Sequence, residues 1–261
     1  MKKIGIMGVG MVGGAMQRFF EEIKKTPVIT YDPGKGFSDQ EEINRAEIIF
    51  ICVPTPFNSE KNNFDTVYLD EAFSILAGSK IIVIKSTVLP GTTVDYQKKF
   101  FQHKILFSPE FLTEATADKD VCEPNRQIVG YTKESQDVAE EVMAALPRAP
   151  FEKIITAEEA EMVKYYNNCF YALKVAYVNQ IYDLCQKLGI DYNMVKECAK
   201  AEPMMGTNHF EVFHKGYRGY GGKCLPKDVR ALIRLAKDVG VDLSILKQAE
   251  EYNNDLVSKQ K

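Results

Sequence analysis

Short apolar runs alternate with amphipathic segments through the first half of this 261-residue chain, and no other feature of the sequence restricts the fold as much. Continuous apolar runs separated by segments of helical period are typical of parallel strands that helices cover on both faces. The sequence therefore predicts an α/β, doubly wound sheet in residues 1–155. Its expected strands are residues 4–7, 28–31, 48–53, 81–84, 105–107 and 127–130, with a helix near 134–146.

A helical period without glycine or proline runs from Ala157 to Leu188 and predicts one helix of about 32 residues, about 48 Å long. Further helices are expected at 192–201, 226–239 and 243–258, so that residues 156–261 form an all-helical second domain. A helix of this length can connect two domains and pack against a second copy of the chain. Since dimers are the commonest oligomers, we expect a homodimer through the long helix.

The composition favours a small-molecule partner. With 33 basic and 36 acidic side chains, the chain lacks the basic excess of a nucleic-acid-binding protein. Its six cysteines are scattered and form no CxxC pair, which is typical of reduced thiols in the cytoplasm. The three histidines lie apart from any cluster with metal-ligand spacing, and no apolar run is long enough to cross a membrane. We therefore expect a soluble cytoplasmic protein without a metal site, a nucleic-acid partner or a membrane partner.

A glycine-rich turn, GVGMVG at residues 8–13, follows the first expected strand and opens an amphipathic helix. In such a turn the first glycine permits the tight bend, the second lets a pyrophosphate approach the backbone, and the third lets helix and strand pack closely. Asp32 stands 19 residues after Gly13, at the end of the second strand. A carboxylate there accepts a hydrogen bond from a ribose 2′-hydroxyl and repels a 2′-phosphate, so the turn predicts a site for NAD rather than NADP.

Polar side chains also follow the third and fourth strands, at Thr55 in VPTP and at Thr87 in KST. Ligands of open α/β sheets bind beyond the carboxyl ends of the strands, so both threonines are candidate hydrogen-bonding groups near the dinucleotide. A turn shaped by two prolines, and a Ser/Thr cap before a helix, explain the same residues equally well, and both interpretations stay open.

Lys164 and Asn168 are four residues apart on the long helix and therefore project from one face. An ammonium and an amide in this arrangement can hold and polarise a substrate oxygen. Such a pair on a helix surface is more often simply solvated, so both interpretations stay open.

Glu110 and Glu114 follow the fifth strand, and Phe111 and Leu112 between them can form the wall of a pocket. A carboxylate held against an apolar wall is expected to have a raised pKa and to serve as a proton carrier. The alternative is a helix start with an acidic first turn.

The turn GYGGKCLPKD at residues 219–228 delivers Cys224 to the start of an expected helix, whose first turn suits the proline and the aspartate that follow. The helix dipole and the neighbouring Lys223 and Lys227 favour a thiolate, the form in which sulfur attacks a carbonyl carbon. Cys224 is therefore a candidate nucleophile. A small buried thiol beside a tight turn is the alternative.

Taken together, these segments resemble the family of NAD-dependent nucleotide-sugar dehydrogenases, the UDP-glucose 6-dehydrogenase and GDP-mannose dehydrogenase group. The resemblance covers nearly the whole chain and rests on GVGMVG, VPTP, KSTVLPGT, SPEFLTEATA, EPNRQIVG, EMVKYYNN and GYGGKCLPKD, in that order. It implies a Rossmann-type NAD-binding domain, a helical central domain that carries the cysteine, and a role in polysaccharide biosynthesis. The implied reaction is a four-electron oxidation of a sugar C6 alcohol to a carboxylate with two NAD turnovers, through a thiohemiacetal and a thioester on Cys224.

The resemblance also implies roles for individual residues. Lys164 stabilises oxyanions with Asn168 beside it, while Asp228, Thr87 and Glu110 position and activate water. The implied cofactor contacts are Gly8, Gly10, Met11, Val12, Gly13, Asp32, Lys35, Thr55, Thr87, Glu114 and Lys227. The implied substrate contacts are Phe111, Leu112, Lys164, Asn168, Tyr217 and Gly221.

Two departures from the family pattern affect these expectations. The family normally has a third, C-terminal domain that encloses the nucleotide part of the substrate, whereas this chain stops at Lys261, so the cleft is expected to lose one wall. Many members have an arginine where this chain has Met204, and Arg218 or Lys215 is a candidate replacement. Two alternatives stay open: a two-electron β-hydroxyacid dehydrogenase, which needs no catalytic cysteine, and a truncated NAD-binding protein that has no turnover or needs a separate C-terminal domain.

Overall fold

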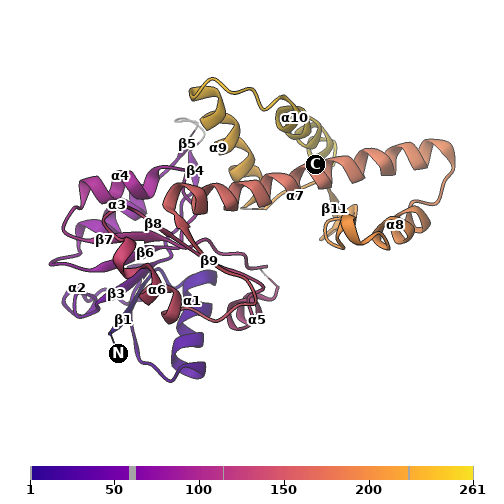
Figure 1. The fold of residues 1–261 in the computed structure, drawn as a ribbon. Coiled ribbons are helices and arrows are strands. Elements are labelled where there is room, and N and C mark those ends of the chain that lie inside the picture. The colour runs from indigo at the N-terminus through magenta and orange to yellow at the C-terminus, as the bar shows by residue number, and fades with distance from the viewer. Residues whose placement is uncertain (1, 59–62, 114, 223, 261) are drawn as a thin grey trace. The chain divides into compact units, whose positions relative to one another are not determined.

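The computed structural model describes residues 2–58, 63–113, 115–222 and 224–260 (Figure 1). The chain divides into two compact units, Met1–Lys164 and Tyr165–Lys261. The division falls inside the long helix α7 (Ala157–Leu188), whose bounds agree with those expected from the unbroken helical period. Each unit has an apolar core of its own.

Unit 1 is built on a seven-stranded sheet with the order β2-β1-β3-β6-β7-β8-β9 among the described residues. The first five strands of this order pair in parallel. Every strand expected from an apolar run is present, which confirms the α/β class. The strands are β1 (Ile4–Met7), β2 (Val28–Tyr31), β3 (Ile48–Ile51), β6 (Ile81–Ile84), β7 (Lys104–Phe107), β8 (Gln127–Tyr131) and β9 (Glu152–Thr156).

The edge of the sheet beyond β7 departs from the expected all-parallel arrangement. Strand β8 pairs with β7 antiparallel, and β9 pairs with β8 in parallel. An apolar run indicates burial but carries no information on strand direction, so the pattern could not predict this reversal. Strand β9 was not expected because it lies at the edge, where none of its residues is fully buried and no continuous apolar run is required.

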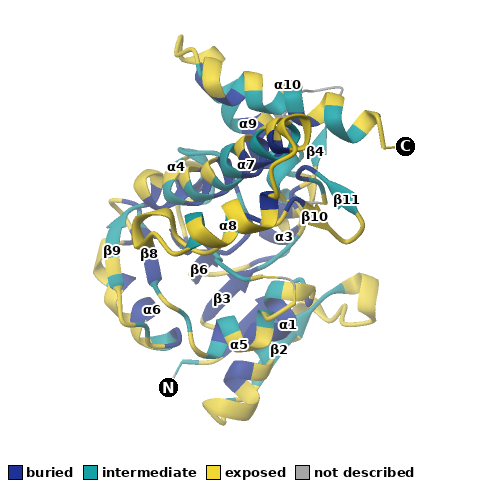
Figure 2. Ribbon diagram, turned by 90° about the vertical axis from the view of Figure 1, so that its right-hand side faces the viewer, coloured by how far each residue is buried: buried dark blue, intermediate teal, exposed yellow. Residues whose placement is uncertain are grey.

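Helices cover both faces of the sheet, as the doubly wound arrangement requires. On β3, Phe50 lies in the core under α1 and α6, whereas Ile49 lies in the core under α3 and α4, because successive strand residues point to opposite faces. Figure 2 shows β3 and β6 buried inside partly exposed helices. The helices and short elements of unit 1 are α1 (Met11–Arg18), η1 (Phe19–Ile23), η2 (Pro33–Lys35), α2 (Gln40–Ile43), β4 (Phe57–Asn58), β5 (Asn63–Phe64), α3 (Val67–Ser74), α4 (Thr92–Lys99), α5 (Ala117–Cys122), η3 (Gln136–Val138) and α6 (Ala139–Ala145).

The strand order reverses at β1, which has β2 on one side and β3 on the other. The carboxyl ends of these parallel strands meet at one edge, where the N–H of Gly8 donates to the Tyr31 carbonyl at 2.8 Å and the N–H of Cys52 donates to the Met7 carbonyl at 2.7 Å. Ligands of open α/β sheets bind at such a reversal point. The fold therefore places the glycine-rich turn where a dinucleotide would bind.

Unit 2 consists of the rest of α7 and the helices expected from the sequence, which begin and end within two residues of the expected bounds. These are α8 (Tyr192–Lys200), α9 (Leu225–Asp238) and α10 (Ser244–Ser258). Between α8 and α9 lie the short turn η4 (Pro203–Met205) and a hairpin of β10 (Phe213–His214) and β11 (Tyr217–Arg218). The hairpin adds two short strands to a unit that is otherwise helical, as expected. Two-residue strands are too short to produce an alternating pattern, so the sequence contains no signal for them.

The core of unit 2 lies between α7, α9 and α10. Cys169 and Ala172 of α7 pack there with Val229 of α9, Leu246 of α10 and Tyr220 of the glycine-rich turn. The ring of Tyr220 thus ties the turn that leads to Cys224 into the core. No helix in the described ranges combines the length and the apolar character of a membrane span.

Candidate functional site

The three glycines of the first turn have different structural roles. Gly8 has a φ of +85°, and a Cβ there would lie 2.8 Å from the Cys52 carbonyl oxygen, while a Cβ at Gly13 would overlap the Gly8 carbonyl oxygen. A Cβ at Gly10 would meet no protein atom within 4 Å. Packing therefore requires Gly8 and Gly13, whereas Gly10 leaves open space at the start of α1, as expected where a pyrophosphate approaches the backbone.

Asp32 and Lys35 both contact this turn. One oxygen of the Asp32 carboxylate accepts a hydrogen bond from the Val9 N–H at 2.8 Å. The Lys35 ammonium donates to the Val9 carbonyl. These contacts join the end of β2 to the turn after β1, so that both expected cofactor residues lie at the turn.

A hollow of about 470 Å³ lies alongside α1. It is lined by Met11 and Arg18 of α1 and by residues 115–119. The side chain of Val12 packs against the core instead, so only its backbone can face a ligand. The open space at Gly10, the helix start and the carboxylate at the end of β2 fit a dinucleotide such as NAD. Glu114, another expected cofactor contact, lies outside the described residues.

Thr55 and Thr87 lie in two loops that are bonded to each other. The Thr55 hydroxyl donates to the Thr87 carbonyl at 2.7 Å, and the Ser86 hydroxyl donates to the Val53 carbonyl at 2.6 Å. The Thr55 hydroxyl proton is therefore used within the protein, which favours the turn-forming interpretation for this residue. Thr87 is half-buried.

Glu110 and Lys164 form an ion pair within unit 1. The Lys164 ammonium lies 2.7 Å from Glu110 Oε1 and also donates to the Glu110 carbonyl at 2.7 Å, while Glu110 Oε2 accepts from the Leu112 N–H at 2.8 Å. The two side chains are only 8% and 13% exposed, so Lys164 is not a solvated surface lysine.

The electrostatics of Glu110 differ from the expectation of a raised pKa. Burial by itself would raise the pKa of Glu110, but the Lys164 ammonium, the Leu112 N–H and the more distant Lys85 ammonium outweigh burial and hold it below the usual range. Glu110 is therefore a carboxylate at neutral pH. The apolar neighbours of Glu110 are visible in the sequence, whereas the two ammonium groups approach it only in the folded protein.

Lys85 is a residue that the sequence argument missed. Its ammonium is buried and donates to the Ser108 hydroxyl at 3.0 Å, just before Glu110. Burial lowers the pKa of Lys85 to about 8, and burial raises the pKa of the nearby Cys52 thiol to about 12. Lys85 opens the KST segment after β6, and this position beside Thr87 was the signal that could have identified it.

Phe111 forms a wall beside the ion pair. The Arg126 guanidinium lies 3.8 Å from the centre of the Phe111 ring, and the Lys164 ammonium lies 6.0 Å from it. Leu112, by contrast, packs against the core on the α1 side of the sheet. Of the two expected wall residues, Phe111 therefore lies beside the ion pair and Leu112 packs in the core.

Glu161, one turn before Lys164 on α7, ties this helix to the start of α4. Its fully buried carboxylate accepts hydrogen bonds from the Gly91 N–H at 2.7 Å, the Thr93 N–H at 2.9 Å and the Thr93 hydroxyl at 2.6 Å. Burial raises the pKa of Glu161 to about 7, although these hydrogen bonds oppose the shift. The contact anchors the loop that follows Thr87.

In unit 2, Asn168 and Asp228 form a buried pair. The Asn168 amide donates to Asp228 Oδ2 at 2.5 Å, and the Lys227 ammonium lies 2.7 Å from Asp228 Oδ1. Asp228 is in the first turn of α9 and is fully buried. Lys227, expected to contact the cofactor, is here bonded to its neighbouring carboxylate.

Cys224 occupies the N-cap position of α9 and is exposed. The six cysteines, all in described positions, form no disulfide. A Cβ at Gly221 would lie 3.2 Å from the Tyr217 hydroxyl, so these two expected substrate contacts are neighbours. Lys223 lies outside the described residues.

Arg218, a candidate for the replacement charge, has its guanidinium engaged within unit 2. Its guanidinium lies 2.7 Å from the Asp183 carboxylate, donates to the Asn179 side chain at 3.1 Å and covers the Tyr182 ring. These contacts hold the hairpin against α7 and leave the guanidinium engaged within unit 2.

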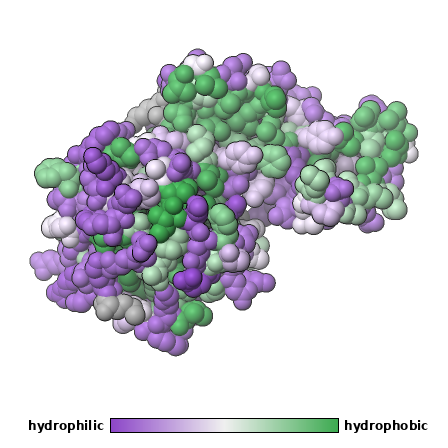
Figure 3. Space-filling model, viewed as in Figure 1, coloured by the Kyte–Doolittle hydropathy of each residue, from purple (hydrophilic) through white to green (hydrophobic). Residues whose placement is uncertain are grey.

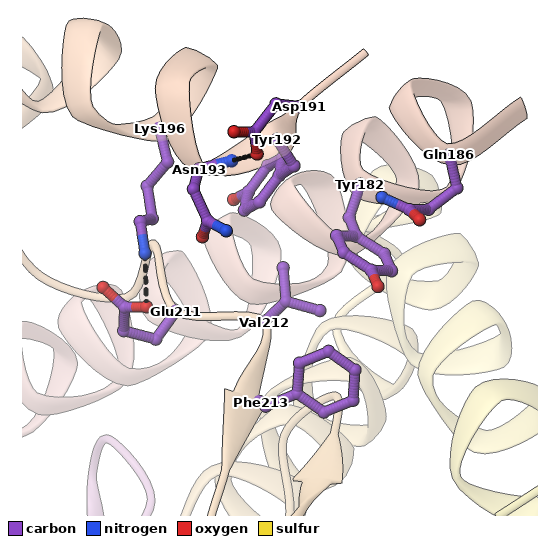
Figure 4. Close-up of a pocket in the computed structure, with 9 residues that line it drawn as sticks. All are labelled: Tyr182, Gln186, Asp191, Tyr192, Asn193, Lys196, Glu211, Val212 and Phe213. Atoms are coloured by element: carbon purple, nitrogen blue, oxygen red, sulfur yellow. Dashed lines mark hydrogen bonds and ion pairs between the residues drawn. The ribbon is translucent and has the colours of Figure 1, made fainter. Parts of the chain in front are cut away.

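A second pocket, of about 220 Å³, lies in unit 2 where α7, α8 and the hairpin meet (Figure 4). Its polar groups are largely paired with each other: Lys196 with Glu211 at 2.7 Å, and the Asp191 carboxylate with the Asn193 N–H at 2.9 Å. No residue expected from the sequence lines it. No group of His, Cys, Asp or Glu in the described part of the chain could hold a metal.

The structure thus assembles two groups of expected residues. In unit 1, Lys164 contacts Glu110 beside Phe111; in unit 2, Asn168 contacts Asp228 in the first turn of the helix that Cys224 caps. Helix α7 carries one member of each group, four residues apart.

The chain is similar in sequence to known UDP-glucose 6-dehydrogenases. UDP-glucose 6-dehydrogenase TuaD of Bacillus subtilis is 30% identical over 296 residues, which cover 97% of this chain and 63% of that protein. UDP-glucose 6-dehydrogenase of Rickettsia bellii is 33% identical over 225 residues, which cover 82% of this chain and 51% of that protein. The chain therefore spans about half to two thirds of the length of these relatives.

Among solved structures, a UDP-glucose dehydrogenase from Pyrobaculum islandicum has the same fold, with a TM-score of 0.84 and 24% identity over 98% of this chain and 68% of that one. Residues 35–147 match the NAD binding domain of the UDP-glucose/GDP-mannose dehydrogenase family, which confirms the expected cofactor. Residues 158–255 match the central domain of the same family. With both matches covering most of its length, the chain belongs to the UDP-glucose/GDP-mannose dehydrogenase family.

Proposed function

We propose that the protein oxidises the C6 alcohol of a nucleotide sugar to the uronate, using NAD in two successive two-electron steps through a thioester on Cys224. The observation that carries the proposal is that α7 presents two buried polar side chains, Lys164 and Asn168, each bonded to one carboxylate. Buried polar groups that are paired with a specific charged partner are typical candidates for catalytic residues.

Bound NAD supplies the hydride acceptor for both oxidations. The residues around Gly10 and Asp32 hold the dinucleotide, and the Lys164 ammonium stabilises the negative charge that develops on the substrate oxygen. After the alcohol has lost a hydride and a proton, Cys224 attacks the aldehyde carbon as a thiolate and forms a thiohemiacetal. Loss of a second hydride and a proton leaves a thioester.

Water then hydrolyses the thioester, giving the carboxylic acid and returning the Cys224 thiol. Glu110 is suited to this step because its lowered pKa keeps it ionised and able to accept a proton from water. Asp228, bonded to Asn168, and Thr87 are proposed to orient the water and the reacting groups.

NADH formation with a panel of nucleotide sugars, UDP-glucose, UDP-N-acetyl sugars and GDP-mannose, tests the proposal. Two NADH per sugar are expected from the unchanged protein, and Cys224→Ala is expected to stop at an aldehyde-level product. Cys198→Ala, at another exposed cysteine of unit 2, is the matched control and is expected to keep the stoichiometry of two. A yield of one NADH per sugar, the same in the unchanged protein and in Cys224→Ala, would instead support the two-electron dehydrogenase. NAD binding without binding of any nucleotide sugar would support the protein without turnover.

We also propose a cytoplasmic homodimer that forms through α7. Tyr166, Phe170, Tyr177 and Leu184 are exposed on this helix at spacings of four and seven residues, which place them along one side. Figure 3 shows hydrophobic side chains gathered at the end of α7 that leads to α8. Light scattering tests this proposal: Tyr177→Glu is expected to give a monomer, and a protein that is monomeric before substitution would exclude the dimer.

A further inference from the structure

Two side-chain amides pair with the backbone of the segment that leads to Cys224. Asn253 of α10 accepts from the Tyr220 N–H at 2.7 Å and donates to the Tyr220 carbonyl at 2.9 Å. Gln260, two residues after α10, accepts from the Arg218 N–H at 2.7 Å and donates to the Arg218 carbonyl at 3.2 Å. Each amide therefore satisfies both backbone groups of one residue, as a neighbouring strand would.

The spacing of the four residues explains how one helix can make both contacts. Arg218 and Tyr220 lie on either side of Gly219, and both present their N–H and C=O groups to side chains of α10 and its extension. Asn253 and Gln260 are seven apart, about two helical turns, so they lie along one side of α10 and its extension. The end of α10 thus covers an edge of the segment that no strand covers.

Asn253 is the buried member of this arrangement. Asn253 is only 3% exposed. Tyr220, whose backbone it holds, is 4% exposed and packs in the core of unit 2. Gly219 between the two bonded residues has a φ of +85°, and a Cβ there would lie 2.6 Å from Asn253 Oδ1. The absence of a side chain at Gly219 is therefore what lets the amide approach the backbone.

We propose that Asn253 and Gln260 are positioning residues that hold the segment before Cys224 and thereby present its sulfur to the aldehyde. The inference rests on the proposed function, because it concerns the step in which Cys224 attacks. It predicts that loss of the amides impairs the second oxidation more than the first, since only the second needs the sulfur in place.

Asn253→Asp tests this most directly, because it keeps the size of the side chain and replaces the donor with an oxygen that faces the Tyr220 carbonyl. We expect the first hydride transfer to be retained and the second to slow by about tenfold or more, so that aldehyde-level product accumulates. Gln260→Ala is expected to act in the same direction with a smaller effect, and it keeps the test open if Asn253→Asp does not fold. Asn254→Ala, at the exposed neighbouring asparagine, is the matched control and is expected to leave both steps unchanged.

A merely structural role would slow both oxidations equally and leave the stoichiometry at two NADH per sugar, and this result in Asn253→Asp and Gln260→Ala would overturn the inference. A readout without substrate separates this failure from failure of the proposed function. Alkylation of Cys224 relative to the exposed Cys198 of the same molecule, followed by mass spectrometry, is expected to change by about threefold in Asn253→Asp. An unchanged ratio would overturn the inference. A changed ratio in a protein that oxidises no nucleotide sugar would support the amide contacts and reject the reaction.

Discussion

The Lys164–Glu110 pair allows a prediction whose size and pH dependence both follow from its surroundings. Lys164→Met removes the ammonium while keeping an unbranched side chain of similar length, and it leaves the Glu110 carboxylate only 13% exposed without its closest positive partner. Breaking a buried ion pair in this way typically costs about 3–5 kcal/mol, because the remaining charge is desolvated and uncompensated. We expect the free energy of unfolding to fall by about 3 kcal/mol at pH 7.

The loss in the free energy of unfolding of Lys164→Met should depend on pH, and the groups around Glu110 determine the direction. In the unchanged protein the pKa of Glu110 is below its usual range, so its contribution to stability is present at neutral pH and is lost as the pH falls through the folded-state pKa. Without Lys164, burial becomes the dominant influence and raises that pKa above its value in the unfolded chain. Stability is then lost as the pH rises through the raised pKa, so the deficit of Lys164→Met should be larger at pH 7 than at pH 5.

Urea unfolding followed by circular dichroism at pH 5 and pH 7 measures both quantities. The double change Lys164→Met with Glu110→Gln removes the stranded charge and should recover about half of the loss or more. Lys98→Met is the control, because its partner Asp95 lies 3.2 Å away with both side chains more than two thirds exposed, and it should cost less than about 0.5 kcal/mol. A loss of under about 1 kcal/mol in Lys164→Met, or a larger loss at pH 5 than at pH 7, would refute the reasoning.

Two further predictions concern the first turn and Glu161. Gly10→Ala should leave the free energy of unfolding within about 1 kcal/mol, because its Cβ meets no protein atom, but it should weaken NAD binding about tenfold in calorimetry. Gly13→Ala, whose Cβ overlaps a backbone oxygen, should cost about 3 kcal/mol in urea unfolding, and equal effects of the two changes would contradict the packing argument. Because burial raises the pKa of Glu161 from 4.5 to about 7, the folded protein binds the extra proton between these values and loses stability as the pH rises, by about 1.4 kcal/mol per unit at most. Glu161→Gln should remove that slope between pH 5 and 7, and an unchanged slope would count against ionisation of this carboxylate.

Much of the fold could be predicted because the information is local. Runs of four apolar residues in β3 and β6, and a run interrupted only by Gly5 in β1, indicate buried strands. The absence of glycine and proline from 157 to 188 indicates one continuous helix. The antiparallel direction of β8 and the edge strand β9 were not predictable in the same way. Strand direction depends on which partner the strand finds, and an edge strand needs no continuous apolar run.

The same distinction between local sequence features and tertiary contacts applies to the candidate site. The order of the motifs was enough to identify the family, the NAD-binding turn and the residue types at Glu110, Lys164 and Cys224. Only the tertiary structure decided that Glu110 has a lowered pKa rather than a raised one, because the Lys164 ammonium that lowers it lies 54 residues away in the chain.

The same reason separates the remaining residues. A glycine with a positive φ, a helix period or an apolar run acts through a few neighbouring residues and is therefore visible in the sequence. The engagement of Arg218 with Asp183, the burial of Lys85 beside Ser108 and the pairing of Asn253 with the Tyr220 backbone join residues 23 to 35 positions apart. Charges and hydrogen-bonding groups at such separations meet only when the helices and strands pack, so the sequence determined which chemistry is available and the packing determined which groups share it.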